Sequence, residues 1–197
     1  TLPLITPEFV VAHPGKNWSF YFLSSNPNLT EWFFDKHPKE NWSWRRLSNN
    51  PSLTHKWIQH YVEDYVDYDN RKKTKFLFNE LSGNPVVTPA FIEKHKDNPH
   101  FAWNWNYIAG NTSLTPEFIR SHICKFIGVG LDALSANPRT TPDIIEEFYD
   151  TNWLWGDEHG QPEMSLSSNT SITPEFVTKY KTKPWDWYRL SHNKAMP

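Results

Sequence analysis

The chain has 197 residues, of which 38% are apolar, and it carries a net charge of −2. This near-neutral balance gives no general attraction to nucleic acid or to an anionic membrane, so neither partner is expected. The single cysteine, Cys124, excludes an internal disulfide and a zinc site built from several thiolates. No apolar run is long enough to cross a bilayer and no signal-like segment opens the chain, so we expect neither membrane insertion nor secretion by its own signal.

One helix start recurs along the chain. In Thr6-Pro7-Glu8-Phe9 the threonine is a good N-cap, the proline is tolerated at the first helical position, and the glutamate suits the positive end of the helix dipole. Apolar residues just before the threonine and at the fourth helical position predict a hydrophobic staple. We name this element helix A and predict a length of about eight or nine residues. Its copies begin at Thr6, Thr30, Thr54, Thr88, Thr115, Thr141 and Thr173.

A second signature predicts a short helix B in each copy. In Trp42-Ser43-Trp44 the two tryptophans are too close for one helical face, but Ser43 can be the N-cap between them. Helix B then ends at a Leu-Ser-x-Asn segment such as Leu47 to Asn50. We expect each asparagine to take the left-handed conformation, and a following proline to stop the helix. Each such asparagine precedes the next threonine by four residues, which predicts one repeated turn.

The seven repeats differ in detail. In repeat 1, helix A is predicted at Thr6 to His13 and helix B at Phe20 to Ser25. Repeat 2 is the cleanest copy. Repeat 3 has ten more residues, read as a longer helix A and a charged, exposed turn at Asp69 to Lys75, and Phe76-Leu77-Phe78 replaces the tryptophan pair.

Repeat 4 follows the common pattern again. Repeat 5 is predicted to have helix A at Thr115 to His122 and thinner packing, because Val129-Gly130-Leu131 replaces the aromatic pair. Repeat 6 has an insertion after Trp153-Leu154-Trp155, where no helix B can be placed. Repeat 7 restores the pattern and ends at Asn193.

The commonest spacing between the threonines is 24 residues, which predicts an all-α protein, an α-solenoid of about seven short helix-turn-helix repeats. Residues 1–197 are expected to form a single repeat array. Because the chain opens inside a helix-A signature, one hypothesis is that the array belongs to a longer chain.

Residues that could carry chemistry each have a plainer explanation. The Phe and Trp residues are expected to form the core. Histidine recurs seven places after threonine (His13, His37, His95, His122), but Tyr or Phe replaces it in other repeats, which favours a semi-buried ring over a metal ligand or catalyst. Asp157-Glu158-His159 and Arg71 to Lys75 are predicted to be solvated. No enzyme motif is present, so we expect no catalytic residue, cofactor or metal, although a site assembled from distant residues stays an alternative.

The segments NPSLT, LTPEFI, KPWDWYRLS and ITPEFV resemble a tandem short repeat found in proteins of large nucleocytoplasmic DNA viruses of protists. The resemblance covers nearly the whole chain, and repeats 5 and 6 depart from its pattern. It implies a viral protein located in the host cytoplasm or in the virus particle, and it carries over no activity and no catalytic residue.

These observations predict a non-catalytic module or scaffold that binds a viral or host protein; the alternative is a minor capsid or cement-type component of the virus particle, assembled into a larger complex. The candidate protein-binding surface is formed by the second and third residues of helix B, which vary while the frame stays constant. These residues are Arg45, Arg46, Asn106, Tyr107, Tyr188 and Arg189. The alternative is that they form a variable solvent-exposed face.

Overall fold

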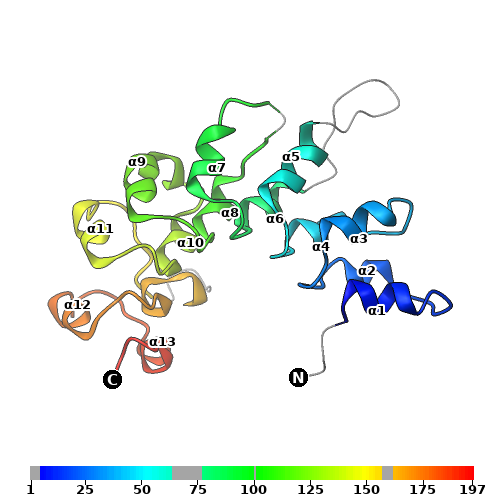
Figure 1. Cartoon of the computed structure of the whole chain (residues 1–197). Coiled ribbons are helices and arrows are strands. Elements are labelled where there is room, and N and C mark those ends of the chain that lie inside the picture. Colours follow the sequence, from blue (N-terminus) through cyan, green and yellow to red (C-terminus); the bar gives the residue numbers. More distant parts are fainter. Residues whose placement is uncertain (1–4, 64–76, 100, 157–161) are drawn as a thin grey trace. The chain divides into compact units, whose positions relative to one another are not determined.

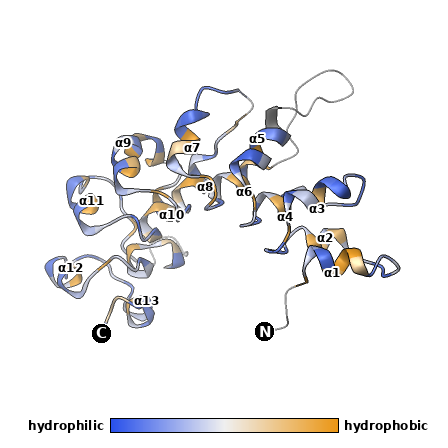
Figure 2. Cartoon of the chain, in the orientation of Figure 1, coloured by the Kyte–Doolittle hydropathy of each residue, from blue (hydrophilic) through white to orange (hydrophobic). Residues whose placement is uncertain are grey.

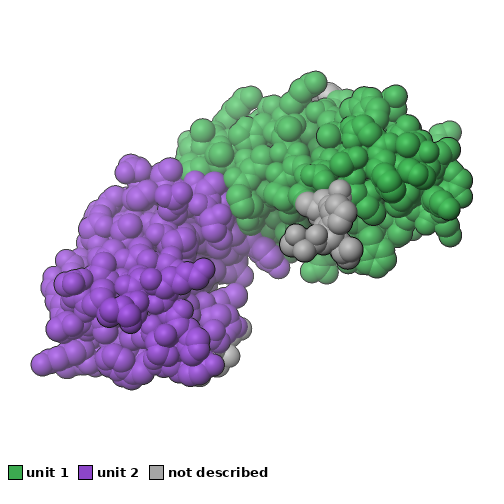
Figure 3. Space-filling view, turned by 60° about the horizontal axis from the view of Figure 1, so that its bottom comes forward, with its two compact units in different colours: residues 1–103 green, residues 104–197 purple. Residues whose placement is uncertain are grey.

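The computed structural model describes residues 5–63, 77–99, 101–156 and 162–197. Within these residues the chain is all-α, with thirteen short α-helices, two 3-10 helices and no strand (Figure 1). It divides into an N-terminal unit, residues 1–103, and a C-terminal unit, residues 104–197 (Figure 3). The prediction of an all-α protein is therefore confirmed.

Helices A and B alternate in the N-terminal unit. Its helices are α1 (Pro7–Ala12), α2 (Phe20–Leu23), α3 (Glu31–Lys36), α4 (Trp44–Ser48), α5 (His55–Glu63), α6 (Phe78–Gly83) and α7 (Pro89–Lys94). Most of these helices have six residues or fewer, shorter than the eight or nine predicted for helix A, because the capping residues lie outside the helical hydrogen bonds. The charged turn predicted at Asp69 to Lys75 lies outside the described residues.

The C-terminal unit follows the same order with two departures. Its elements are α8 (Trp105–Ala109), α9 (Pro116–Phe126), α10 (Leu131–Ala136), α11 (Pro142–Glu147), η1 (Pro162–Met164), η2 (Leu166–Ser168), α12 (Pro174–Lys179) and α13 (Trp187–His192). Helix α9 runs past the predicted end at His122, because Ile123 and Phe126 continue its buried face. Repeat 6 has only the 3-10 helices where helix B is expected, in agreement with the register lost there.

The predicted helix caps are confirmed. Six of the seven repeat threonines accept a hydrogen bond from the third amide of helix A, at 3.0–3.3 Å. Thr141 occupies the N-cap position without this bond. Ser43, Asn104 and Asp186 cap helices α4, α8 and α13 with their side chains. Ser19 occupies the N-cap position of α2 without a side-chain bond, and Trp155 of repeat 6 begins no helix. In repeats 1, 2, 4 and 7 the second aromatic of the pair is the first residue of helix B, as predicted.

The prediction for the asparagine that ends each repeat was wrong. Asn84, Asn137 and Asn193 have φ between −70° and −75° and extended backbone instead of the left-handed conformation. The reason lies in their buried side chains, whose amides donate to two backbone carbonyls of the preceding repeat. Asn50, Asn84, Asn137, Asn169 and Asn193 all do this, at 2.7–3.1 Å.

The same side chains also hold the turn that follows. The Asn50 side-chain oxygen accepts from the amide of Ser52 at 2.9 Å, and the corresponding bond recurs at the amides of Asn28, Val86, Ser113, Arg139, Ser171 and Ala195. This bond fixes the step of four residues to the next threonine. We call this series of side chains the asparagine ladder.

The serine of each Leu-Ser-x-Asn segment makes a second link between repeats. The Ser48 hydroxyl donates to the Trp44 carbonyl within repeat 2 at 2.8 Å and accepts from the Leu77 amide of repeat 3 at 2.9 Å. Ser24, Ser135 and Ser167 likewise accept an amide of the following repeat. Buried polar groups are therefore paired between neighbouring repeats within each unit.

The first tryptophan of the aromatic pair closes the loop between helices A and B. The Trp42 indole donates to the His37 carbonyl at 2.8 Å, and Trp18, Trp153 and Trp185 make the equivalent bond five residues back. Trp103 lies eight residues after His95, and its buried indole nitrogen has no hydrogen-bond partner among the residues that the structure describes. Hydrophobic and hydrophilic residues alternate along most of the helices (Figure 2), and the buried side chains include Phe33, Trp42, Trp57, Phe126 and Trp153, so Phe and Trp residues contribute to the core as predicted.

Candidate functional site

The six predicted binding residues lie in pairs on three helices. Arg45 and Arg46 belong to α4 in the N-terminal unit, and the other four belong to α8 and α13 in the C-terminal unit. Each pair follows an N-cap whose side chain accepts an amide hydrogen bond from the first turn. The sequence therefore placed them correctly at the second and third helical positions, and the structure brings them together only in pairs.

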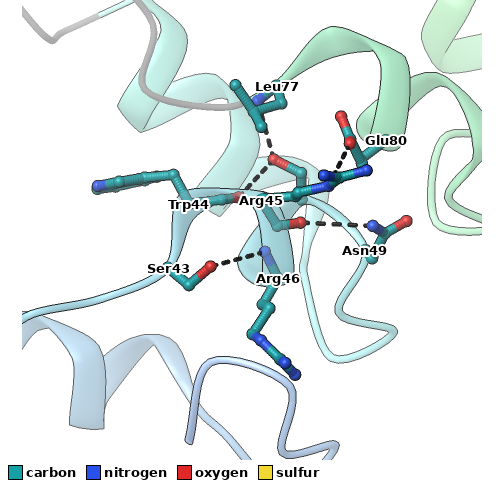
Figure 4. A network of polar contacts seen from close by, with 8 residues as sticks. Ser43, Trp44, Arg45, Arg46, Asn49, Leu77 and Glu80 are labelled. Carbon is teal, nitrogen blue, oxygen red and sulfur yellow. Dashed lines mark hydrogen bonds and ion pairs between the residues drawn. The ribbon is translucent and has the colours of Figure 1, made fainter. Parts of the chain in front are cut away.

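Arg45 and Arg46 point to opposite sides of α4 (Figure 4). The Arg45 guanidinium forms an ion pair with Glu80 of the next repeat, 2.8 Å between Nε and Oε1, while its side chain stays 74% exposed. An exposed pair of this kind adds little stability. The Arg46 guanidinium turns instead toward the preceding repeat.

Arg46 lies against two exposed aromatic rings. Its guanidinium carbon is 4.5 Å from the centre of the Tyr21 ring and 5.4 Å from that of Phe22, and its Nη1 donates to the Ser25 hydroxyl at 2.9 Å. Phe22 is 66% exposed and Tyr21 47% exposed. We call Tyr21, Phe22, Ser25 and Arg46 the Arg46 cluster.

Sequence reasoning missed Tyr21 and Phe22, although a signal for them was present. They are the second and third residues of α2, the same positions that Arg45 and Arg46 occupy in α4. Arginine over aromatic rings is a favourable cation–π arrangement, and the hydrogen bond to Ser25 restrains the guanidinium. The cluster is therefore an ordered, exposed surface of the residue types enriched at protein interfaces.

In the C-terminal unit the predicted residues form two smaller groups. Asn106 and Tyr107 are exposed on α8. Tyr188 is 69% exposed and its ring lies 4.6 Å from that of His192 on the same helix. Arg189 is 3.6 Å from the Glu163 carboxylate, and its buried Nε has no hydrogen-bond partner among the described residues.

The recurring histidines pack against a phenylalanine ring; His37 and His122 are half-buried as predicted, whereas His13 is exposed and His95 is buried. His37 and Phe33 have ring centres 4.6 Å apart, and His13, His95 and His122 contact the phenylalanine four residues earlier in the same way. Tyr180 makes the same contact with Phe176. An aromatic side chain can therefore replace histidine at this position without loss of the contact.

The described residues contain no group of three or more His, Cys, Asp or Glu side chains that could hold a metal ion. Asp157-Glu158-His159 and Arg71 to Lys75, both predicted to be solvated, lie outside the described residues. No helix in the described part of the chain is both long and apolar enough to cross a membrane.

Shifted pKa values come from ordinary contacts between helices. Burial and a 3.0 Å hydrogen bond to Asp35 raise the pKa of the Tyr61 phenol. The hydrogen bond from Lys179 lowers the pKa of Glu146, and a hydrogen bond from Thr141, together with Arg120, lowers that of Asp143. These groups join neighbouring A helices and do not converge on a pocket.

Comparison of the chain with protein-family models, with curated proteins and with solved structures finds no match.

Proposed function

We propose that the chain is an α-solenoid that binds a protein partner through the surface formed by the second and third residues of its B helices. The observation that carries this proposal is the Arg46 cluster, in which Phe22 is 66% exposed beside an arginine that is already ordered. The asparagine ladder and the serine links support the solenoid, because each joins one repeat to the next with the same bonds.

The energetic argument favours a protein as the ligand. Covering Phe22 removes apolar surface from water, and Arg46 already has its guanidinium restrained, so less side-chain entropy is lost on binding.

The test compares two pairs of exposed aromatic and cationic residues in the same unit. The chain is used to capture proteins from the cells in which it occurs, and the partner is then titrated against a Phe22→Ala/Arg46→Ala variant. We expect this variant to bind at least about fivefold more weakly, since truncating an interface anchor costs about 1 kcal/mol or more. Its melting temperature should stay within about 2 °C of the wild type, because both side chains lie at the surface.

The matched control is Trp32→Ala/Lys36→Ala. Trp32 is 44% exposed on α3, and the Lys36 ammonium lies 4.7 Å from the centre of its ring. This variant should bind the partner like the wild type. Equal affinity of the wild type and the Phe22→Ala/Arg46→Ala variant would remove the Arg46 cluster from the proposal, and selective loss in the control would move the binding surface to helix A.

A structural component of a virus particle is the second candidate. The observation that favours it is the exposure of large aromatic side chains in both units, such as Phe22 and Tyr188, as in a subunit that is covered on assembly. Quantitative mass spectrometry of purified particles and of the soluble fraction of infected cells separates the candidates. Many copies per particle support the structural role, and confinement to the soluble fraction supports the adaptor.

A further inference from the structure

Three aromatic rings meet where repeats 6 and 7 pack against each other in the C-terminal unit. Tyr149 and Trp155 belong to repeat 6, and Tyr180 follows the last residue of helix α12 in repeat 7. The ring centres of Tyr149 and Trp155 are 6.5 Å apart, and the Tyr180 ring lies 5.7 Å from the first and 5.6 Å from the second. Because the Tyr149 and Trp155 rings cross at 67°, their faces form a corner. We call these three rings the aromatic corner.

The ammonium group of Lys183 lies in this corner. Its nitrogen is 4.7 Å from the centre of the Tyr149 ring and 4.8 Å from that of the Trp155 ring. The ammonium has no hydrogen bond or ion pair with any described residue, whereas Lys179, four residues earlier, pairs with Glu146 at 2.7 Å. The Lys183 ammonium is therefore held by its cation–π contacts with the two rings.

The common pattern of the repeats does not require Tyr149. This residue lies eight positions after the repeat threonine, and the other six repeats have no aromatic residue there. Those residues are Pro14, Pro38, Val62, Lys96, Ile123 and Lys181. The positions of Trp155 and Tyr180, in contrast, are aromatic in most repeats. Tyr149 is 41% exposed and so contributes little to the core, but its ring completes the corner.

The corner suits an ammonium that carries methyl groups better than it suits the primary ammonium of lysine. A primary ammonium is strongly hydrated and has three N–H donors, for which the ring faces supply no strong acceptor. A trimethylammonium group has the same charge, no N–H and a methyl surface that packs against aromatic rings. Lys183 is half-buried on a flexible four-carbon stem, so its ammonium can leave the corner for water.

We propose that the aromatic corner binds a trimethylammonium group, which displaces Lys183 as the internal occupant. Trp155, only 6% exposed, is the inner wall of the site, and Tyr149 is the outer wall. Two sources supply this chemistry: a trimethylated lysine of a protein, and a free small molecule such as choline. The proposal is independent of the Arg46 cluster, whose residues all lie in the N-terminal unit.

Titration of the full chain with choline, followed by NMR chemical shifts, tests the proposal. The ligand control is the uncharged isostere of choline, in which carbon replaces the quaternary nitrogen, and choline should bind at least about fivefold more tightly. Lys183→Ala should bind choline about three- to sixfold more tightly than the wild type, because the competing internal ammonium is gone. A corner that only joins repeats 6 and 7 would not show this gain.

Variants of the outer wall separate the ring from its volume. Tyr149→Leu should lose choline binding, whereas Tyr149→Phe should keep it, since only the second variant retains an aromatic ring. The matched control is Trp32→Leu, because Trp32 is 44% exposed and also has a lysine ammonium, that of Lys36, 4.7 Å from its ring centre. This control lies outside the corner and should bind choline like the wild type. Circular dichroism checks that every variant keeps the wild-type helix content.

Two results overturn the proposal. One is equal affinity for choline and its isostere in both the wild type and Lys183→Ala, and the other is undiminished choline binding by Tyr149→Leu. The same titration with a capped Gly-Lys-Gly tripeptide, trimethylated on its lysine, distinguishes the two sources. Tighter binding of this tripeptide than of choline supports a protein ligand, and the reverse order supports a small molecule. None of these results affects the test of the Arg46 cluster.

Discussion

Repeats 2 and 6 make the same bonds with their surroundings although only repeat 2 has a second α-helix. In repeat 2 the Ser48 hydroxyl donates to the Trp44 carbonyl four residues earlier, and in repeat 6 the Ser167 hydroxyl donates to the Trp155 carbonyl twelve residues earlier. Both serines then accept an amide from the following repeat. The bonds between repeats, and not helix B, are therefore the constant part of this architecture.

The largest loss of stability is expected from substitutions in the asparagine ladder. Asn50→Ala in repeat 2 and Asn169→Ala in repeat 6 should each lower the free energy of unfolding by about 3 kcal/mol, because each removes two hydrogen bonds to carbonyls of the preceding repeat and one from a turn amide. Urea denaturation followed by circular dichroism measures the loss. The exposed Asn49→Ala variant should lose less than about 0.5 kcal/mol. A loss confined to repeat 2 would mean that helix B, and not the ladder, stabilises the repeat.

An intermediate effect is expected from the indole hydrogen bonds. Trp42→Phe and Trp153→Phe each remove a bond to a carbonyl, at 2.8 and 2.9 Å, and should lower the free energy of unfolding by about 1–2 kcal/mol more than Trp103→Phe. Trp103 is the matched control, because its buried indole nitrogen has no hydrogen-bond partner in the described part of the chain. Equal losses in all three variants would assign the effect to ring volume alone.

The smallest effect on the free energy of unfolding is expected from pH, which acts through two carboxyl groups of repeat 6. Asp143 and Glu146 have lowered pKa values from Thr141, Arg120 and Lys179. A carboxyl whose pKa is lower in the folded chain stabilises it above the ordinary pKa, and this contribution disappears as the pH falls through the folded value. The free energy of unfolding should therefore decline below about pH 4.

Denaturation of an Asp143→Asn/Glu146→Gln variant at pH 7 and pH 3 checks this assignment. The variant should be slightly less stable than the wild type at pH 7, and the difference should be smaller at pH 3, because protonation removes the carboxylate charges of the wild type as the pH falls through their pKa values. The difference should be small, since both carboxylates are solvent-exposed. An equal difference at both pH values would exclude ionisation as its cause.

The sequence predicted best what is decided within a few residues. The bond from the Phe33 amide to the Thr30 hydroxyl spans three positions, so residue type and spacing were sufficient to find it. The role of the asparagines was missed because their partners lie 24 or more residues away, as with Asn50 and Asn26. A signal existed in the strict recurrence of asparagine, which local backbone preference alone does not require.

In the candidate site, too, the features set by local sequence were predictable, and those set by neighbouring repeats were not. The positions of Arg45 and Arg46 on α4 followed from the Ser43 cap, but their opposite directions depend on Glu80 and Ser25 in the neighbouring repeats. The extension of α9 was foreseeable from Ile123 and Phe126, which continue its apolar face at a spacing of three. Only the packing of neighbouring helices shows that Phe126 is buried beside Trp105.

The asparagine ladder has a consequence for how such a chain can change in length. The Asn84 amide reaches the Asn50 carbonyl across 34 residues at 3.0 Å, and the Asn50 amide reaches the Asn26 carbonyl across 24 residues at the same distance. The ten additional residues of repeat 3 leave this hydrogen-bond distance unchanged, because in the sequence they lie between the start of helix A and the start of helix B. New sequence can therefore be gained or lost at that connection while the register of the repeats is preserved, which gives evolution and protein engineering the same insertion point in every repeat.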